Sequence, residues 1–131
     1  MSDFKKLKVW RKGHALALNV RRVAVGIRGR DNIALRTQMI RAAMSVPGTI
    51  VEGAGQTSQR EFARFIRFAL NSASELEYHL IMARDTRAIS VADFESLSSQ
   101  TVEVQKMLHG LLQSVLVSPR KGAKASQGVV T

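Results

Sequence analysis

Cysteine is absent from the 131-residue sequence, and proline occurs only twice. Without cysteine the chain has no disulfide bond, no thiolate metal site and no cysteine nucleophile. No segment alternates apolar and polar residues with the period of two that is typical of strands. No run approaches the ~18–20 consecutive apolar residues of a membrane-spanning helix, and no apolar secretory segment follows the N-terminus. We therefore expect a cytoplasmic protein built from helices.

Acidic residues are scarce as well. The chain has 10 Asp and Glu against 20 Lys and Arg, a net charge of +10. Residues 1–30 hold nine basic and one acidic side chain, a net charge of +8, whereas residues 88–117 hold one basic and three acidic, a net charge of −2. Such a basic excess favours binding to polyanions, nucleic acid before anionic membrane. A basic surface also serves solubility, so charge alone leaves both interpretations open.

Apolar residues make up 45% of the chain, enough for one domain with a core along three or four helices. They recur at helical spacing in four segments separated by short turns. In the first segment, for example, Val9, Leu16 and Val20 share one face at 100° per residue. Ser58 and Glu61 match a capping box that would begin the third helix. The expected helices cover about residues 7–27, 33–53, 58–83 and 90–117.

Pro47 interrupts the second expected helix. An interior proline removes one backbone donor and costs ~3 kcal/mol. The apolar positions Met39, Val46 and Ile50 nevertheless continue one face across it. We expect a kinked helix, and a break into two short helices is the alternative.

Amphipathic helices joined by short loops pack best as an up-down bundle. We therefore predict an all-α fold in which residues 1–117 form an antiparallel four-helix bundle. Ser118 and Pro119 end the fourth helix. Residues 118–131 are small, polar and basic, so we predict a disordered tail there.

Catalytic constellations are not apparent. A di-iron bundle needs Glu-x-x-His motifs on two helices, and the sequence has none. His14, His79 and His109 fall on three different expected helices, so we expect no metal site. No serine lies in a Gly-x-Ser-x-Gly elbow, and residues 53–55 lack the ending of a phosphate loop. We expect no cofactor, although free amides after this turn could bind an anion weakly.

Four polar residues interrupt otherwise apolar faces. Ser45 and Glu52 lie near the core side of the second helix, and Ser72 and Glu75 lie among apolar residues of the third. Buried carboxylates need partners, and Arg41 is a plausible one. We favour a network that fixes helix register or a subunit contact over a catalytic role.

Basic residues cluster on the first helix and could follow the phosphates of a nucleic acid. Trp10 is the one aromatic residue among them on that helix, and we expect it in the core. Base stacking is therefore not predicted, and binding should be driven by the backbone with weak sequence specificity. The candidate nucleic-acid-binding residues are Lys5, Lys6, Lys8, Arg11, Lys12, Arg21, Arg22, Arg28 and Arg30.

Several motifs resemble one known family. They are Leu7-x-Val9-Trp10, then Gln38-x-x-Arg41-Ala42-Ala43-x-Ser45-Val46-Pro47-x-x-Ile50-x-Glu52-Gly53, then Phe62-x-x-Phe65 and Ala69-x-x-Ser72-x-x-Glu75-Leu76-Glu77-x-x-Leu80. This pattern resembles the four-helix-bundle family named after proteins encoded in intervening sequences of 23S ribosomal RNA genes. The likeness covers about residues 4–115. The sequence departs from the family pattern at Thr49, Val51 and Asn71 and in a short first loop, which affects loop geometry rather than the fold.

The resemblance implies a ring-shaped assembly, typically a homopentamer, without known enzymatic activity. The chain is also similar to the accessory proteins of diversity-generating retroelements, which bind nucleic acid and partner a reverse transcriptase. Residues carried over from the family would serve fold and assembly. They are Trp10, Gln38, Arg41, Ser45, Pro47, Glu52, Ser72 and Glu75.

Three hypotheses follow for function. The leading one is a non-enzymatic, ring-forming protein that binds RNA or DNA. The alternative is a protein–protein adaptor without a nucleic-acid role, with the acidic fourth helix as its docking surface. The third is an enzyme that uses a cluster of Arg41, Glu52 and Glu75, which lacks an accompanying nucleophile, metal set or cofactor loop.

Overall fold

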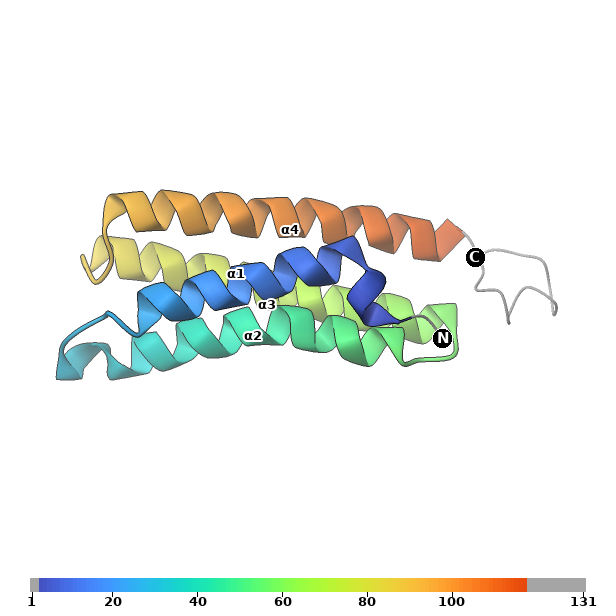
Figure 1. The fold of residues 1–131 in the computed structure, drawn as a ribbon, viewed down its shortest axis with the longest axis horizontal. Helices are drawn as coiled ribbons and strands as arrows, with labels where there is room; N and C mark the ends of the chain where they lie inside the picture. The colour runs from blue at the N-terminus through green and yellow to red at the C-terminus, as the bar shows by residue number, and fades with distance from the viewer. Residues whose placement is uncertain (1–2, 118–131) are drawn as a thin grey trace.

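The computed structural model describes residues 3–117, and these residues form an all-helical fold without a strand. The long helices are α1 (Lys8–Ala24), α2 (Ile33–Ala54), α3 (Gln59–Asp85) and α4 (Val91–Val117), and short 3₁₀ turns precede α1 (η1, Phe4–Lys6) and α2 (η2, Arg30–Asn32). Figure 1 shows the chain reversing its direction at each connection, so α1 begins and α4 ends at the same end of an elongated bundle. The predicted all-α class is confirmed. The expected tail, residues 118–131, lies outside the described residues.

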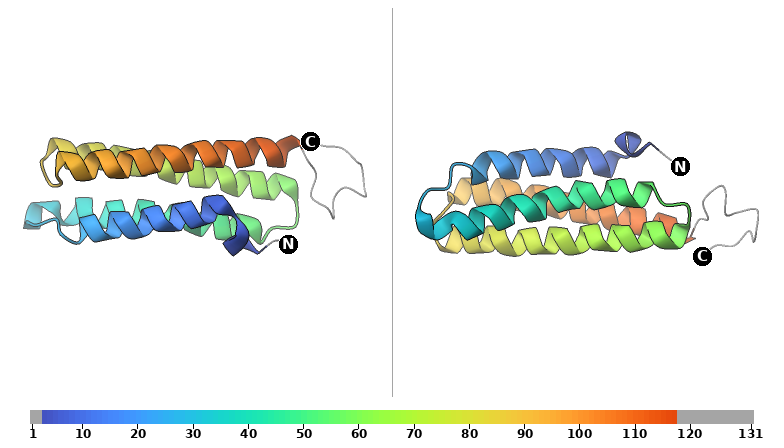
Figure 2. Two further views of the ribbon diagram at one scale, coloured as in Figure 1. Left: turned by 45° about the horizontal axis from the view of Figure 1, so that its top comes forward. Right: turned by 90° about the horizontal axis from the view of Figure 1, so that it is seen from below.

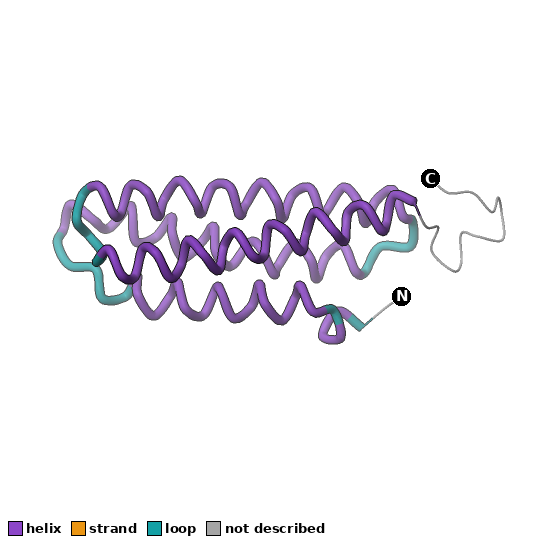
Figure 3. Tube along the Cα trace, turned by 90° about the horizontal axis from the view of Figure 1, so that it is seen from above, coloured by secondary structure: helices purple, strands orange, loops and turns teal. Residues whose placement is uncertain are grey.

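Each helix packs against two neighbours. The contact between α2 and α3 is the most extensive, and α1 closes the bundle against α4 with the thinnest contact. Both views in Figure 2 show α1 beside α2 and α3 beside α4. The connections lie only at the two ends of the bundle (Figure 3), so the long sides present helix surface alone. Within residues 3–117 no helix is both long enough and apolar enough to cross a membrane.

Caps and turns set the helix ends close to the predicted positions. The hydroxyl of Ser58 accepts a hydrogen bond from the backbone N–H of Glu61 (3.1 Å) at the start of α3, as half of the expected capping box. Ser90 caps α4 in the same way, accepting from the N–H of Asp93 (3.0 Å). The first helix ends three residues earlier than predicted, at Ala24. Ile27 is nevertheless buried, because a tight turn carries it back onto the core.

Pro47 does not break α2. The helix runs unbroken through it, so the alternative of two short helices is wrong. Pro47 is buried, and a Cβ at Gly13 of α1 would lie 3.8 Å from the Cβ of Pro47. The ring is thus packed against the neighbouring helix. Tertiary packing of this kind compensates for the backbone hydrogen bond that proline cannot donate.

The core is aliphatic and runs the length of the bundle. Thr101 is the one buried polar side chain among residues 3–117, and its hydroxyl donates to the carbonyl of Leu97 (2.7 Å). Small side chains at the contact between α2 and α3 bring these helices close together. The largest fully buried apolar side chains are Leu16, Met39, Ile50, Ile66, Leu76, Leu80, Leu97 and Leu108.

Candidate nucleic-acid interface on the first helix

All nine candidate basic residues are exposed. Two of them lie in η1, five on α1 and two in the connection to α2. The α1 segment contains no acidic residue. The bundle needs only one face of α1 for its core, which leaves the other faces free to carry this charge. The structure therefore presents basic side chains to solvent near both ends of α1 and in the turns that flank it.

Most of these cations remain without an acidic partner. Among residues 3–117 the only ion pair they make is between Lys12 Nζ and Glu103 (3.4 Å), in which both side chains are about half exposed. Arg11 donates to the carbonyl oxygen of Lys5 (3.1 Å), and Arg22 donates to the side-chain oxygen of Asn19 (2.8 Å). Because exposed ion pairs contribute at most ~1 kcal/mol, a phosphate group can compete for Lys12 as well.

Trp10 lies at the edge of the core rather than inside it. The side chain packs against the core but is only partly buried. Its indole ring stacks on the imidazole of His14, with centroids 5.1 Å apart and an interplanar angle of 6°, and Phe4 meets it edge-on at 5.0 Å. The expectation of a core tryptophan is therefore wrong in part. The spacing of four residues between Trp10 and His14 is the sequence feature that would have indicated this pair.

Ser45 and Ser72 come together across the contact between α2 and α3. Their hydroxyl oxygens are 2.7 Å apart and half-buried, which links α2 to α3. The carboxylates do not join them: Glu52 and Glu75 are exposed, and neither forms an ion pair with Arg41 within residues 3–117. The expected burial of these carboxylates beside Arg41 is therefore wrong, and their role in a subunit contact stays a prediction.

The core-facing positions explain this outcome. Met39, Val46 and Ile50 face the core on α2 and leave Arg41 and Glu52 on the solvent side. Gln38 is also exposed, and on α3 Ala73 and Leu76 leave Glu75 outside in the same way. The polar residues of the family motif thus form a surface that flanks the contact between α2 and α3.

The described part of the chain brings no three metal-binding side chains together. His14, His79 and His109 lie on α1, α3 and α4, and the Nε2 atom of His79 is buried without a hydrogen-bond partner. The enzyme hypothesis relied on a cluster of Arg41, Glu52 and Glu75, and these side chains do not pair within residues 3–117.

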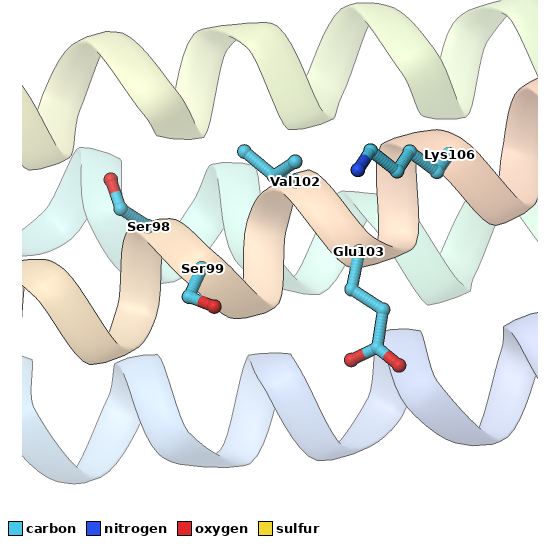
Figure 4. Close-up of a pocket in the computed structure, with 5 residues that line it drawn as sticks. All are labelled: Ser98, Ser99, Val102, Glu103 and Lys106. Carbon is cyan, nitrogen blue, oxygen red and sulfur yellow. The ribbon is translucent and has the colours of Figure 1, made fainter.

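A shallow hollow of about 420 Å³ lies on α4 (Figure 4). In Figure 4 Glu103 points toward α1, whereas Ser98 and Val102 point to the opposite side of α4. Because these side chains diverge and come from one helix, they do not converge on a common ligand. The hollow is lined by Ser98, Ser99, Val102, Glu103 and Lys106.

A family model described as 23S rRNA-intervening sequence protein matches residues 5–110. The chain belongs to this family. A crystal structure described as a protein of unknown function from the S23 ribosomal protein family of Bacteroides thetaiotaomicron has the same fold, with a TM-score of 0.75 and 23% identity. The likeness covers 80% of this chain and 98% of that one. No curated protein matches the chain.

The residues of the family motif fall into a group at the contact between helices and a group on the surface. In this member of the 23S rRNA-intervening sequence protein family, Pro47 is buried and Ser45 and Ser72 join α2 to α3. Gln38, Arg41, Glu52 and Glu75 lie on the surface. The basic residues of α1 form a separate surface.

Proposed function

We propose that this protein is a cytoplasmic, non-enzymatic nucleic-acid-binding protein, and that α1 and its flanking turns hold the sugar–phosphate backbone of RNA or DNA. The observation that carries the proposal is the set of nine exposed basic side chains within residues 5–30, of which only Lys12 has an ion-pair partner among residues 3–117. The family name, which refers to 23S rRNA, supports a role connected with RNA.

Binding of this kind depends on salt more than on sequence. Each neutralised phosphate releases counterions, so the logarithm of the binding constant falls with the logarithm of the salt concentration. The slope is about −0.7 per phosphate for single strands and about −0.9 for duplex DNA. Contacts to phosphates position a nucleic acid but do not identify its bases, so sequence preference should be weak.

The proposal includes assembly into a ring-shaped homo-oligomer, a pentamer on the family resemblance, that acts with a reverse transcriptase or on ribosomal RNA. Large exposed apolar side chains outside α1 and α2 support self-association, among them Tyr78 (55% exposed) and Ile81 (37% exposed) on α3. A ring would repeat the basic helix in each subunit. Several weak phosphate contacts would then act together and raise the apparent affinity.

The test is a binding titration with RNA and DNA pools at several salt concentrations. A triple variant, Lys8→Ala, Arg22→Ala and Arg28→Ala, removes three cations from the interface. Each contact contributes about −0.7 to the slope with single strands. The variant should therefore make the slope less steep, by up to about 2. The absence of binding by the unchanged protein at about 50 mM salt would refute the proposal.

A second triple variant supplies the control. Arg60→Ala, Arg67→Ala and Lys106→Ala remove the same charge from exposed positions on α3 and α4. If α1 is the interface, this control should leave the salt slope nearly unchanged. Equal losses in both variants would mean that net charge, rather than α1, determines binding.

The second candidate is a protein–protein adaptor. The sequence of residues 88–117, which includes α4, carries a net charge of −2 and contrasts with the rest of the chain. Exposed Val102 and Leu116 give α4 an apolar contribution to such a surface. Co-purification of one specific protein after nuclease treatment, with no binding of RNA or DNA, would favour the adaptor.

A further inference from the structure

An apolar groove of about 470 Å³ runs between α1 and α2, which lie side by side in Figure 1. Ala17 and Pro47 are buried at its floor, whereas Leu18 (51% exposed) and Met44 (58% exposed) flank it. No acidic side chain lines it. The lining residues are Trp10, His14, Ala17, Leu18 and Arg21 of α1 and Met44, Pro47, Gly48 and Val51 of α2.

We propose that this groove receives one unpaired base of a single-stranded nucleic acid, which stacks on His14 while Arg21 holds an adjacent phosphate. The inference rests on the proposed function and deepens it, because it adds contact with a base to the binding of the backbone. It also replaces the sequence-based expectation that no base stacks on this protein.

The aromatic pair is the first argument. Trp10 and His14 are nearly parallel, at 6°, and Phe4 lies edge-on against Trp10 at 5.0 Å. The imidazole is therefore held in place by a ring on one side. His14 is exposed, and no second ring stacks on it among residues 3–117. A base can add to this stack with little loss of side-chain freedom.

Charge is the second argument. Arg21 lines the same groove seven residues after His14, which corresponds to roughly 10.5 Å along a helix axis. It is exposed and has no ion-pair partner among the described residues. Lys8 and Arg11, which lie close to Trp10 in the sequence, are exposed as well. A ligand that joins a flat apolar ring to a nearby negative charge matches the His14 ring and the Arg21 side chain in the same groove.

Size and shape select a single strand. The groove volume lies within the range of small-molecule sites, about 300–1,000 Å³, and is large enough for one base. Bases of a duplex are stacked on one another, whereas those of single strands can be splayed out onto protein side chains. A second copy of this chain is the competing occupant. A symmetric pairing through this groove would bring two basic α1 surfaces together, which charge disfavours, so a second copy would have to enter with a different face.

Trp10 is the only tryptophan in the chain, so indole fluorescence reports directly on this groove. The experiment titrates the full chain with an oligothymidylate strand of about ten nucleotides, a length within known single-strand site sizes. The matched ligand is an abasic strand of the same length and charge. We expect the oligothymidylate strand to quench Trp10 and to bind roughly 5- to 150-fold more tightly than the abasic strand.

The outcomes separate this inference from the proposed function. Equal affinity for both strands without quenching would overturn base stacking and leave binding to the backbone intact. If neither strand binds at low salt, the proposed function fails together with the inference. A change of Trp10 emission with protein concentration, in the absence of nucleic acid and with no response to either strand, would show that a second copy occupies the groove.

Variants test the role of the ring. His14→Ala should reduce the affinity for the oligothymidylate strand to that of the abasic strand, and His14→Phe should restore most of the difference. His109→Ala, at an exposed position on α4, is the control and should change neither affinity. Thermal unfolding of each variant checks that the fold is kept. If His14→Ala weakened binding of both strands equally, histidine would not act by stacking, and the inference would fail.

Discussion

At Gly53, α2 lies against α3 with no room for a side chain. A Cβ added there would lie 2.8 Å from the Cβ of Phe65 and 3.0 Å from Cδ1 of Phe62, closer than such atoms pack. Both phenylalanines belong to α3, and Phe62 is buried. Gly53→Ala therefore forces the last turn of α2 away from α3. Gly48, five residues earlier on the same helix, has nothing within 4 Å of the corresponding position.

The two glycines separate helix propensity from steric fit. Alanine inside a helix is favoured over glycine by about 0.8–1.0 kcal/mol, so Gly48→Ala should stabilise the protein by up to that amount. Gly53→Ala gains no more than this and must also accommodate an overpacked methyl group, which costs about 1–3 kcal/mol. We expect the free energy of unfolding of Gly53→Ala to be lower than that of Gly48→Ala by about 1–3 kcal/mol.

Urea unfolding followed by circular dichroism measures this difference through the midpoints, provided that the denaturant slopes agree. Both variants should keep the helical spectrum of the unchanged protein. If Gly53→Ala were as stable as Gly48→Ala, the close approach of α2 and α3 at this point would be incorrect.

Two further predictions concern side-chain pairs. Ser45→Ala and Ser72→Ala should each destabilise the protein, because each leaves the other hydroxyl without its partner. The double variant should be less destabilised than the sum of the two by about 0.5–1.5 kcal/mol. Additive effects in this double-mutant cycle would contradict the 2.7 Å contact. Glu103→Gln should change the free energy of unfolding by less than about 1 kcal/mol, since the pair with Lys12 is exposed. It should also raise RNA affinity more than Glu95→Gln on the same helix does, because only Glu103 holds Lys12, and equal effects in filter-binding titrations would contradict that.

Much of the fold follows from periodicity. Each stripe of aliphatic residues in the sequence became a buried face, and Ser58 and Ser90 cap α3 and α4. The effect of Pro47 on its helix was harder to predict. Helix propensity alone predicts that an interior proline disrupts a helix, whereas packing of Pro47 against α1 keeps α2 unbroken. The last residues of the first helix were also beyond local rules, since Ile27 is buried after the helix has ended.

The candidate site was less predictable than the fold. The exposure of the basic residues of α1 could be predicted because they lie off the apolar stripe of that helix. The carboxylates were expected on the wrong side. Glu52 and Glu75 are exposed, because the buried faces of α2 and α3 are set by Met39, Val46 and Ile50 and by Ala73 and Leu76. The groove depends on how α1 and α2 pack together, and the spacing of Trp10 and His14 indicates the ring pair but not the hollow beside it.

The floor of the groove has a consequence for the thermodynamics of binding. Ala17, Pro47 and Gly48 have no side-chain rotamers to lose, so a ligand that settles on them orders nothing there. Leu18, Met44 and Arg21 around it would lose side-chain freedom, at a cost of about 0.5–2 kcal/mol each. The floor of the groove is therefore a surface without rotatable side chains. A ligand that binds there loses its own conformational freedom but orders nothing beneath it.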